Sequence, residues 1–146
     1  MTSHTIPTQA SALRVGGYMC IKERPCKITD VKTSKTGKHG GNKCHFYARD
    51  IFTDQVHEHL EMSTKNIEVP YVTKNDYQLV GIDEDTVSYL DHKGNNQNDL
   101  SMPNLSDSDM ELSDTIREKF ADGEELYITV ISAMGISAIK GFQISK

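Results

Sequence analysis

Short segments of alternating apolar and polar residues, separated by turn residues, run through most of this sequence. In residues 43–52, Cys44, Phe46 and Ala48 recur at every second position, which places them on one face of an extended strand. Turn residues such as "ERP" at 23–25 separate such segments. The same character predicts strands at 18–22, 26–33, 55–62, 77–82, 86–91 and 125–134. A chain with this pattern is expected to be mainly β.

One segment differs, because residues 106–120 follow the period of an α-helix. Ile116 and Phe120 are four residues apart and share a face of that helix. Ser113 is expected to cap the helix, and Gly123 to end it. Its acidic beginning is typical of a solvated face. We therefore predict an all-β chain with one short helix.

The boundary between two domains is expected near Pro70, where the charge balance changes sign. Residues 1–70 hold ten Lys and Arg against seven Asp and Glu, whereas residues 71–146 hold six against fourteen. We predict a flexible tail at 1–10 and a small β-barrel at 11–70. About five strands and one inserted helix in residues 71–146 are typical of a Greek-key barrel such as an OB-fold, with a loop between the strands at 86–91 and 125–134.

Composition limits the class of protein. A hydrophobic content of 36% with 25% charged residues is too apolar for a disordered chain. No apolar run is long enough to cross a membrane, and the first residues lack the pattern of a secretory signal, so no membrane partner is expected. Three cysteines without disulfide-framework spacing favour a reducing, cytoplasmic location.

The sequence "KTSKTGKHGGNK" at 32–43 falls between two predicted strands and reads as a long hairpin loop. Lys38 follows Gly37 and precedes His39, so small or flexible neighbours flank it. A Walker-type phosphate loop is excluded, because Lys32 stands where that motif needs glycine and His39 where it needs Ser or Thr. Two interpretations remain: a solvated turn with lysines for solubility, or a loop presented to a partner.

Basic residues are concentrated around this loop. Residues 22–49 contain eight Lys and Arg against two Asp and Glu, although the whole chain has a net charge of −5. Such a patch attracts polyanions, and its binding is expected to depend on salt.

A zinc site is not indicated by the cysteines. Five residues separate Cys20 from Cys26, which is outside the usual spacing of two to four. Cys44 and His45 are adjacent on a predicted strand and would point to opposite faces. The cysteines are therefore expected to pack in a small core, and no metal is predicted.

No catalytic residues are predicted either. His57 and His59 share a strand face, but no third ligand is evident and Glu58 points away, so we interpret them as surface histidines. No local motif supports a Ser or Cys nucleophile with a His partner. We predict that the protein is not an enzyme.

The segment "TSKTGKHGGNK" at 33–43 strongly resembles the modification loop of the translation initiation factor 5A family, the hypusine-containing factors of eukaryotes and archaea that are related to bacterial elongation factor P. Two departures are present: "HGGNK" replaces the usual "HGHAK", so Gly41 stands in place of a histidine, and glycines at 135 and 141 make the C-terminal end less helix-prone. The resemblance covers nearly the whole chain and continues through "RPCKI" (24–28), "DIFT" (50–53), "VP" (69–70), "KNDYQLVGI" (74–82), "GEELYITVISAM" (123–134) and "AIK" (138–140).

This resemblance implies an N-terminal SH3-like barrel followed by a C-terminal OB-fold. It also implies that Lys38 becomes hypusine, a modification derived from spermidine, through deoxyhypusine synthase and deoxyhypusine hydroxylase. No other cofactor is implied. The loop that presents this lysine would consist of Ser34, Lys35, Thr36, Gly37, His39, Gly40, Gly41 and Lys43.

The function that the resemblance implies is translational. The factor would bind the ribosome, contacting rRNA and the P-site peptidyl-tRNA, and hypusine would stabilise the peptidyl-tRNA near the peptidyl-transferase centre. Elongation through stalls such as proline runs, and termination, would both be promoted. The alternative is a general RNA-binding module without hypusine-dependent activity, which would tolerate Lys38→Arg because phosphate contact needs only charge.

Overall fold

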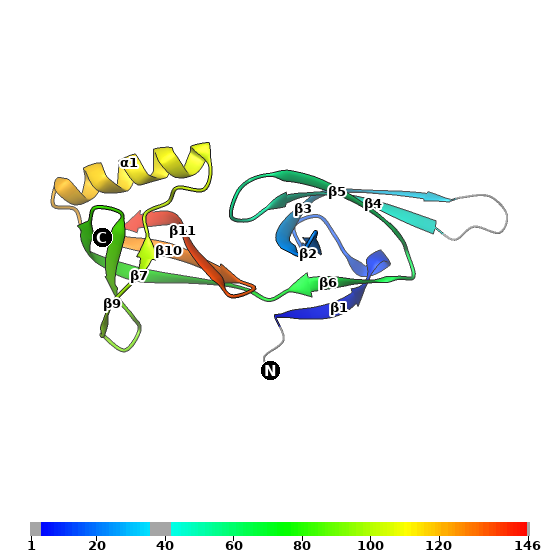
Figure 1. The fold of residues 1–146 in the computed structure, drawn as a ribbon, viewed down its shortest axis with the longest axis horizontal. Helices are drawn as coiled ribbons and strands as arrows, with labels where there is room; N and C mark the ends of the chain where they lie inside the picture. The colour runs from blue at the N-terminus through cyan, green and yellow to red at the C-terminus, as the bar shows by residue number, and fades with distance from the viewer. Residues whose placement is uncertain (1–3, 36–41, 146) are drawn as a thin grey trace. The chain divides into compact units, whose positions relative to one another are not determined.

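The computed structural model describes residues 4–35 and 42–145, and the chain divides into two compact units, Met1–Tyr71 and Val72–Lys146 (Figure 1). The boundary expected near Pro70 falls beside this division. The all-β chain with one helix is confirmed, and so are the SH3-like barrel and the OB-fold.

The first unit contains two antiparallel sheets. The larger one has the order β2-β3-β4-β5 and consists of β2 (Tyr18–Ile21), β3 (Arg24–Lys35), β4 (Asn42–Asp50) and β5 (Val56–Met62). The smaller one pairs β1 (Thr5–Gln9) with β6 (Asn66–Pro70), and a 3-10 helix, Ala10–Ala12, follows β1. Met19, Ile28 and Phe46 are almost completely buried in the core of this unit. Their burial follows from the alternation of apolar residues along the strands.

The flexible tail predicted for residues 1–10 is wrong for its described part. Thr5–Gln9 pair in register with Asn66–Pro70, and the Ala10 amide donates a 2.8 Å hydrogen bond to the Lys65 carbonyl. Ala10 is also buried, at 1% exposure. The strand "TIPTQ" has no apolar alternation that would predict it. Backbone hydrogen bonds to a segment some sixty residues away hold it in place.

The second unit is a five-stranded antiparallel sheet with the order β11-β10-β7-β8-β9. Strands β9 and β11, at the two ends of this order, also contact each other, as in a small closed barrel. Its elements are β7 (Val72–Asp83), β8 (Thr86–Leu90), β9 (Asn96–Ser101), α1 (Asp107–Ala121), β10 (Leu126–Ala133) and β11 (Ile136–Ile144).

A two-residue turn joins β10 to β11. Met134 and Gly135 have φ of 52° and 79°, the left-handed conformations that a tight hairpin turn of type I′ requires. Further along this pair of strands the register shifts between Thr129 and Val130, which face Gly141 and Ile139. Lys140 is therefore an extra residue in β11, a β-bulge.

Two local predictions are corrected by the strands. Asn96–Ser101 were expected in a loop but form β9, a polar strand in which only Leu100 is buried. The turn expected at 23–25 lies at Lys22 and Glu23, whose φ values are 53° and 66°, so that Arg24 and Pro25 already belong to β3. Both segments consist mainly of polar or charged residues. The first therefore lacks the apolar alternation that predicts a strand, and the second lacks the glycine or asparagine that predicts a turn with positive φ.

The helix α1 begins earlier than the expected cap at Ser113. Ser106 is the N-cap, and its hydroxyl accepts a 3.1 Å hydrogen bond from the Asp109 amide. Ser113 instead lies inside the helix, 7% exposed. Ile116 is buried and Phe120 packs against the same core, as predicted, and Gly123 follows the end of the helix with φ 85°. Within the described residues, no helix has both the length and the apolar character needed to cross a membrane.

Candidate functional site

The predicted modification loop connects β3 to β4, which run side by side (Figure 1). Of the residues assigned to it, Ser34 and Lys35 end β3 and Lys43 lies at the start of β4. The remaining ones lie outside the described residues: Thr36, Gly37, Lys38, His39, Gly40 and Gly41.

The base of this hairpin is held by a regular antiparallel ladder. Lys35 faces Asn42 and Ser34 faces Lys43, directly next to the segment 36–41. The Asn42 carbonyl also accepts a 2.8 Å hydrogen bond from the Ser63 amide, which ties the start of β4 to the turn after β5. The two ends of the segment that contains Lys38 are therefore anchored in a rigid sheet.

An ion pair at the other end of the same strands joins two of the motifs that carry the resemblance noted in the sequence. The Arg24 guanidinium of "RPCKI" donates hydrogen bonds of 2.7 and 3.3 Å to the Asp50 carboxylate of "DIFT". Backbone amides of Phe52 and Thr53 donate to the same carboxylate, at 2.8 and 3.1 Å. Asp50 is 1% exposed, so these four donors satisfy a buried charge and fix the turn that leads to β5. The shared motifs here stabilise the scaffold.

The environment of Asp50 perturbs its acidity. Burial pushes the pKa of this carboxyl upward, but the hydrogen bonds from Arg24, Phe52 and Thr53 outweigh burial and hold the pKa below its ordinary value of 3.8. The charged form is therefore the one that the folded protein stabilises.

We expect Asp50→Ala to lower the free energy of unfolding at neutral pH by about 2 kcal/mol, since it leaves buried donors unpaired. Because the folded-state pKa is depressed, the carboxylate stabilises the fold above the unfolded-state value, and this contribution is lost as the pH falls below 3.8 through the folded value. Urea unfolding of both proteins at neutral and acid pH measures the difference. Glu58→Ala, at an exposed carboxylate of the same unit, is the control; a gap that stays constant with pH would contradict the assignment.

Two of the three cysteines, Cys26 and Cys44, lie in the protein core as predicted. Cys26 and Cys44 are buried, at 0% and 2% exposure, and Cys20 is half-buried. Burial raises the pKa of the Cys26 thiol to about 11, and that of Cys20 is raised for the same reason. A thiol with a raised pKa is a poor nucleophile and a poor metal ligand, because the thiolate is the reactive form.

The two histidines on β5 do share a face, as predicted, but they are only partly exposed. His57 faces Ala48 and His59 faces Phe46, so both lie on the core side of the sheet edge and are half-buried. His59 Nε2 lies 3.3 Å from a Glu61 carboxylate oxygen. In the described part of the chain, no group of three His, Cys, Asp or Glu side chains is arranged to hold a metal ion.

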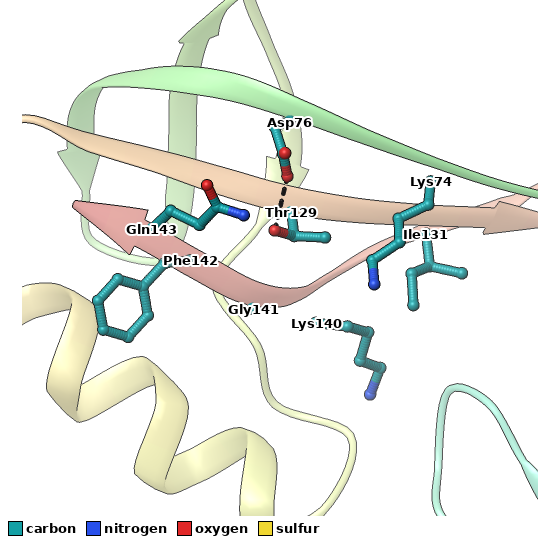
Figure 2. A pocket seen from close by; sticks show the side chains of 8 residues that line it. All are labelled: Lys74, Asp76, Thr129, Ile131, Lys140, Gly141, Phe142 and Gln143. Carbon is teal, nitrogen blue, oxygen red and sulfur yellow. Dashed lines mark hydrogen bonds between the residues drawn. The ribbon is translucent and has the colours of Figure 1, made fainter. Parts of the chain in front are cut away.

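A hollow of about 320 Å³ lies on the second unit, along β10 and β11 (Figure 2). The Thr129 hydroxyl donates a 2.7 Å hydrogen bond to the Asp76 carboxylate across its floor. The Lys140 side chain runs away from this pair (Figure 2), and its ammonium lies 3.0 Å from both carboxylate oxygens of Asp109 in α1. Lys140 therefore joins β11 to α1, a contact that the sequence motif "AIK" alone does not reveal.

Two family models match the chain and together cover most of it. Residues 3–65 match the model described as "Translation initiation factor 5A-like, N-terminal". Residues 71–143 match the model described as "Eukaryotic elongation factor 5A hypusine, DNA-binding OB fold". The predicted modification loop lies inside the first match.

Individual relatives agree with these models. The chain is 46% identical over 142 residues to eukaryotic translation initiation factor 5A-1 of Saccharomyces cerevisiae, covering 97% of this chain and 87% of the relative. It is 48% identical to the 5A-1 factor of Arabidopsis thaliana, over 94% and 87% of the two chains. Among solved structures, an eif-5a family protein from Naegleria fowleri is 42% identical with a TM-score of 0.92, covering 97% of this chain and 99% of the other. The factor 5A of Methanococcus jannaschii is 26% identical with a TM-score of 0.74, over 98% of both chains.

Proposed function

The chain belongs to the eukaryotic translation initiation factor 5A family, a family of translation factors, and from that premise we propose that it acts on the ribosome through hypusine at Lys38. Deoxyhypusine synthase transfers the aminobutyl group of spermidine to the Lys38 amine, and deoxyhypusine hydroxylase then adds a hydroxyl group. The observation that carries the proposal is the "SKTGKHG" motif, whose first two residues, Ser34 and Lys35, end β3.

The chemistry of the loop supports this role. A lysine that must enter another enzyme's active site needs small neighbours, and Gly37 and Gly40 provide them. The modified side chain has about twice the reach of lysine and one more positive charge. Such an arm can follow phosphates and 2′-hydroxyl groups of RNA into a narrow channel.

The rest of the chain positions this arm. The factor binds the ribosome in the cytoplasm beside the P-site peptidyl-tRNA, and the basic stretch 22–49 faces rRNA and tRNA phosphates. Hypusine steadies the acceptor end of the peptidyl-tRNA near the peptidyl-transferase centre, which promotes elongation through proline runs and also termination. The factor is not an enzyme: the ribosome performs the chemistry, and the factor contributes positioning.

We expect Lys38 to be the only residue converted to hypusine in protein taken from its own cells, because it is the lysine that lies between Gly37 and His39 in the matched motif. A protease that cuts after acidic residues releases residues 31–50, which contain Lys38 together with Lys32, Lys35 and Lys43. Fragmentation of this peptide in a mass spectrometer locates the adduct. The Lys38→Arg protein, expressed in the same cells, is the control and should give the bare peptide. An unmodified Lys38, or an adduct on Lys35 or Lys43, would refute the assignment.

A further inference from the structure

The solvent-facing side of β3, β4 and β5 in the first unit has a composition of its own. Buried Cys44, Phe46 and Ala48 alternate along β4 with residues that point the other way. The register of the sheet puts these outward residues in cross-strand rows. Two neighbouring rows define the surface called here the outer sheet face: Lys32, His45 and Leu60 in one, and Asp30, Tyr47 and Glu58 in the next.

Two aromatic rings are stacked at the centre of the outer sheet face. The rings of His45 and Tyr47 have centroids 4.5 Å apart and planes inclined by 21°. The Lys32 ammonium lies 5.3 Å from the centroid of the Tyr47 ring, within the range of a cation–π contact. The His45 side chain remains 37% exposed, so a flat ligand can reach the stack from solvent. The two residues are neighbours on the same face of β4, which holds their rings in this stacked arrangement.

Basic side chains surround this stack. Lys27 and Arg49 form the row on one side of it, facing each other across β3 and β4, and Lys43 lies in the row on the other side. Together with Lys32 they outnumber the two carboxylates of the face, Asp30 and Glu58, by four to two. An aromatic platform rimmed by cations is complementary to a ligand that is flat and negatively charged.

We propose that the outer sheet face binds unpaired RNA, with a base stacked on the His45–Tyr47 pair and backbone phosphates beside Lys32, Lys43 and Arg49. Unpaired RNA is favoured because the bases of an A-form duplex are stacked inside the helix, where an aromatic pair on a sheet cannot reach them. Sheet surfaces with exposed aromatic residues bind single strands in this way in several unrelated folds. This binding goes beyond the proposed function, because it requires neither hypusine nor the segment 36–41.

The exposed Leu60 beside the stack would also suit a protein partner. The excess of basic residues favours RNA, since a protein interface is poor in lysine at its centre. The two ligands differ in their response to salt, which the experiment uses.

The test is fluorescence anisotropy of a labelled oligouridylate titrated with the full chain expressed with a bare Lys38. We expect Tyr47→Ala to weaken binding about tenfold through loss of stacking, whereas Tyr47→Phe keeps it. Tyr71→Ala removes an exposed tyrosine of the same unit away from the outer sheet face and should bind like wild type. Melting temperatures of all variants separate lost binding from lost folding.

A salt titration tests the charged rim. We expect Lys32→Ala to reduce the slope of log affinity against log salt by about 0.7, the value for one phosphate contact on a single strand. Lys65→Ala, in the turn after β5, is the matched lysine control and should leave the slope unchanged. The proposal is overturned by wild-type affinity in folded Tyr47→Ala, by equal competition from an RNA duplex of the same length, or by no binding to any RNA. Lys38→Arg should bind as wild type here, so these outcomes are separate from those for hypusine.

Discussion

Ribosomes supplied with Lys38→Arg factor are expected to stall on a proline-rich message although the variant still binds them. Arginine keeps one positive charge, so affinity should stay within about threefold of the unmodified protein. Arginine cannot accept the aminobutyl group, and the extended arm is lost. When a group acts by positioning reactants, displacing it by about an ångström can lower the reaction rate about 100-fold. The rate of peptide synthesis on this message should therefore fall toward the rate measured without any factor.

A translation assay on this message, run beside a ribosome-binding assay, measures both quantities. The factor must come from cells that contain the modifying enzymes. Lys35→Arg is the matched control, because Lys35 ends β3 beside Asn42 and is not the predicted acceptor. Full synthesis with Lys38→Arg would show that hypusine is not required, and the general RNA-binding module would then replace the proposal.

The strands that could be predicted from the sequence are those with one buried face. In β4, every second residue from Cys44 to Ala48 is buried, and this alternation was readable without the structure. In β9 only Leu100 is buried, so "NQNDLS" reads as a loop until β8 pairs with it. Strand β1 was missed for the same reason, since its pairing with β6 depends on hydrogen bonds between distant backbone segments. Propensity does not encode such partners.

Parts of the candidate site could likewise be predicted from the sequence, and other parts could not. The lysine and its loop are predicted from a contiguous motif, whereas the ion pair of Arg24 with Asp50 requires the register of two strands. The alternation of β4 predicts that His45 and Tyr47 face outward together, but it does not predict that their rings stack or that Lys32 joins them. Contacts between strands depend on distances that no local pattern contains.

The ion pair between Asp109 and Lys140 was the least predictable contact of the second unit. These residues are 31 positions apart, and Lys140 is the extra residue of the bulge in β11. A bulge can re-aim a side chain, and here the Lys140 ammonium reaches Asp109 near the start of α1. Both side chains are largely buried, because only 12% of the Lys140 side chain and 5% of the Asp109 side chain are exposed. The Leu105 amide also donates a 3.0 Å hydrogen bond to the Asp109 carboxylate. The pair therefore fixes the helix to the barrel.

We expect Asp109→Ala to be the most destabilising of the substitutions considered, lowering the free energy of unfolding by about 3–5 kcal/mol. The cost is that large because the substitution removes a largely buried carboxylate that the Lys140 ammonium contacts at 3.0 Å. Lys140→Met removes that charge in turn, so the double variant should be more stable than the sum of the two single effects predicts, by about 1–3 kcal/mol. Urea unfolding of the four proteins gives this coupling energy.

The exposed ion pair of the same unit provides the control. Arg117 lies 3.1 Å from Asp85, but 40% and 85% of these side chains are exposed, so Asp85→Ala should cost less than about 1 kcal/mol. Solvent screens that pair, whereas Asp109 and Lys140 are shielded from water by the barrel and the helix. Two results would contradict the prediction: Asp109→Ala costs no more than Asp85→Ala, or the effects of Asp109→Ala and Lys140→Met simply add. In either case α1 is held by its apolar face around Ile116, and the bulge in β11 does not aim Lys140 at a stabilising partner.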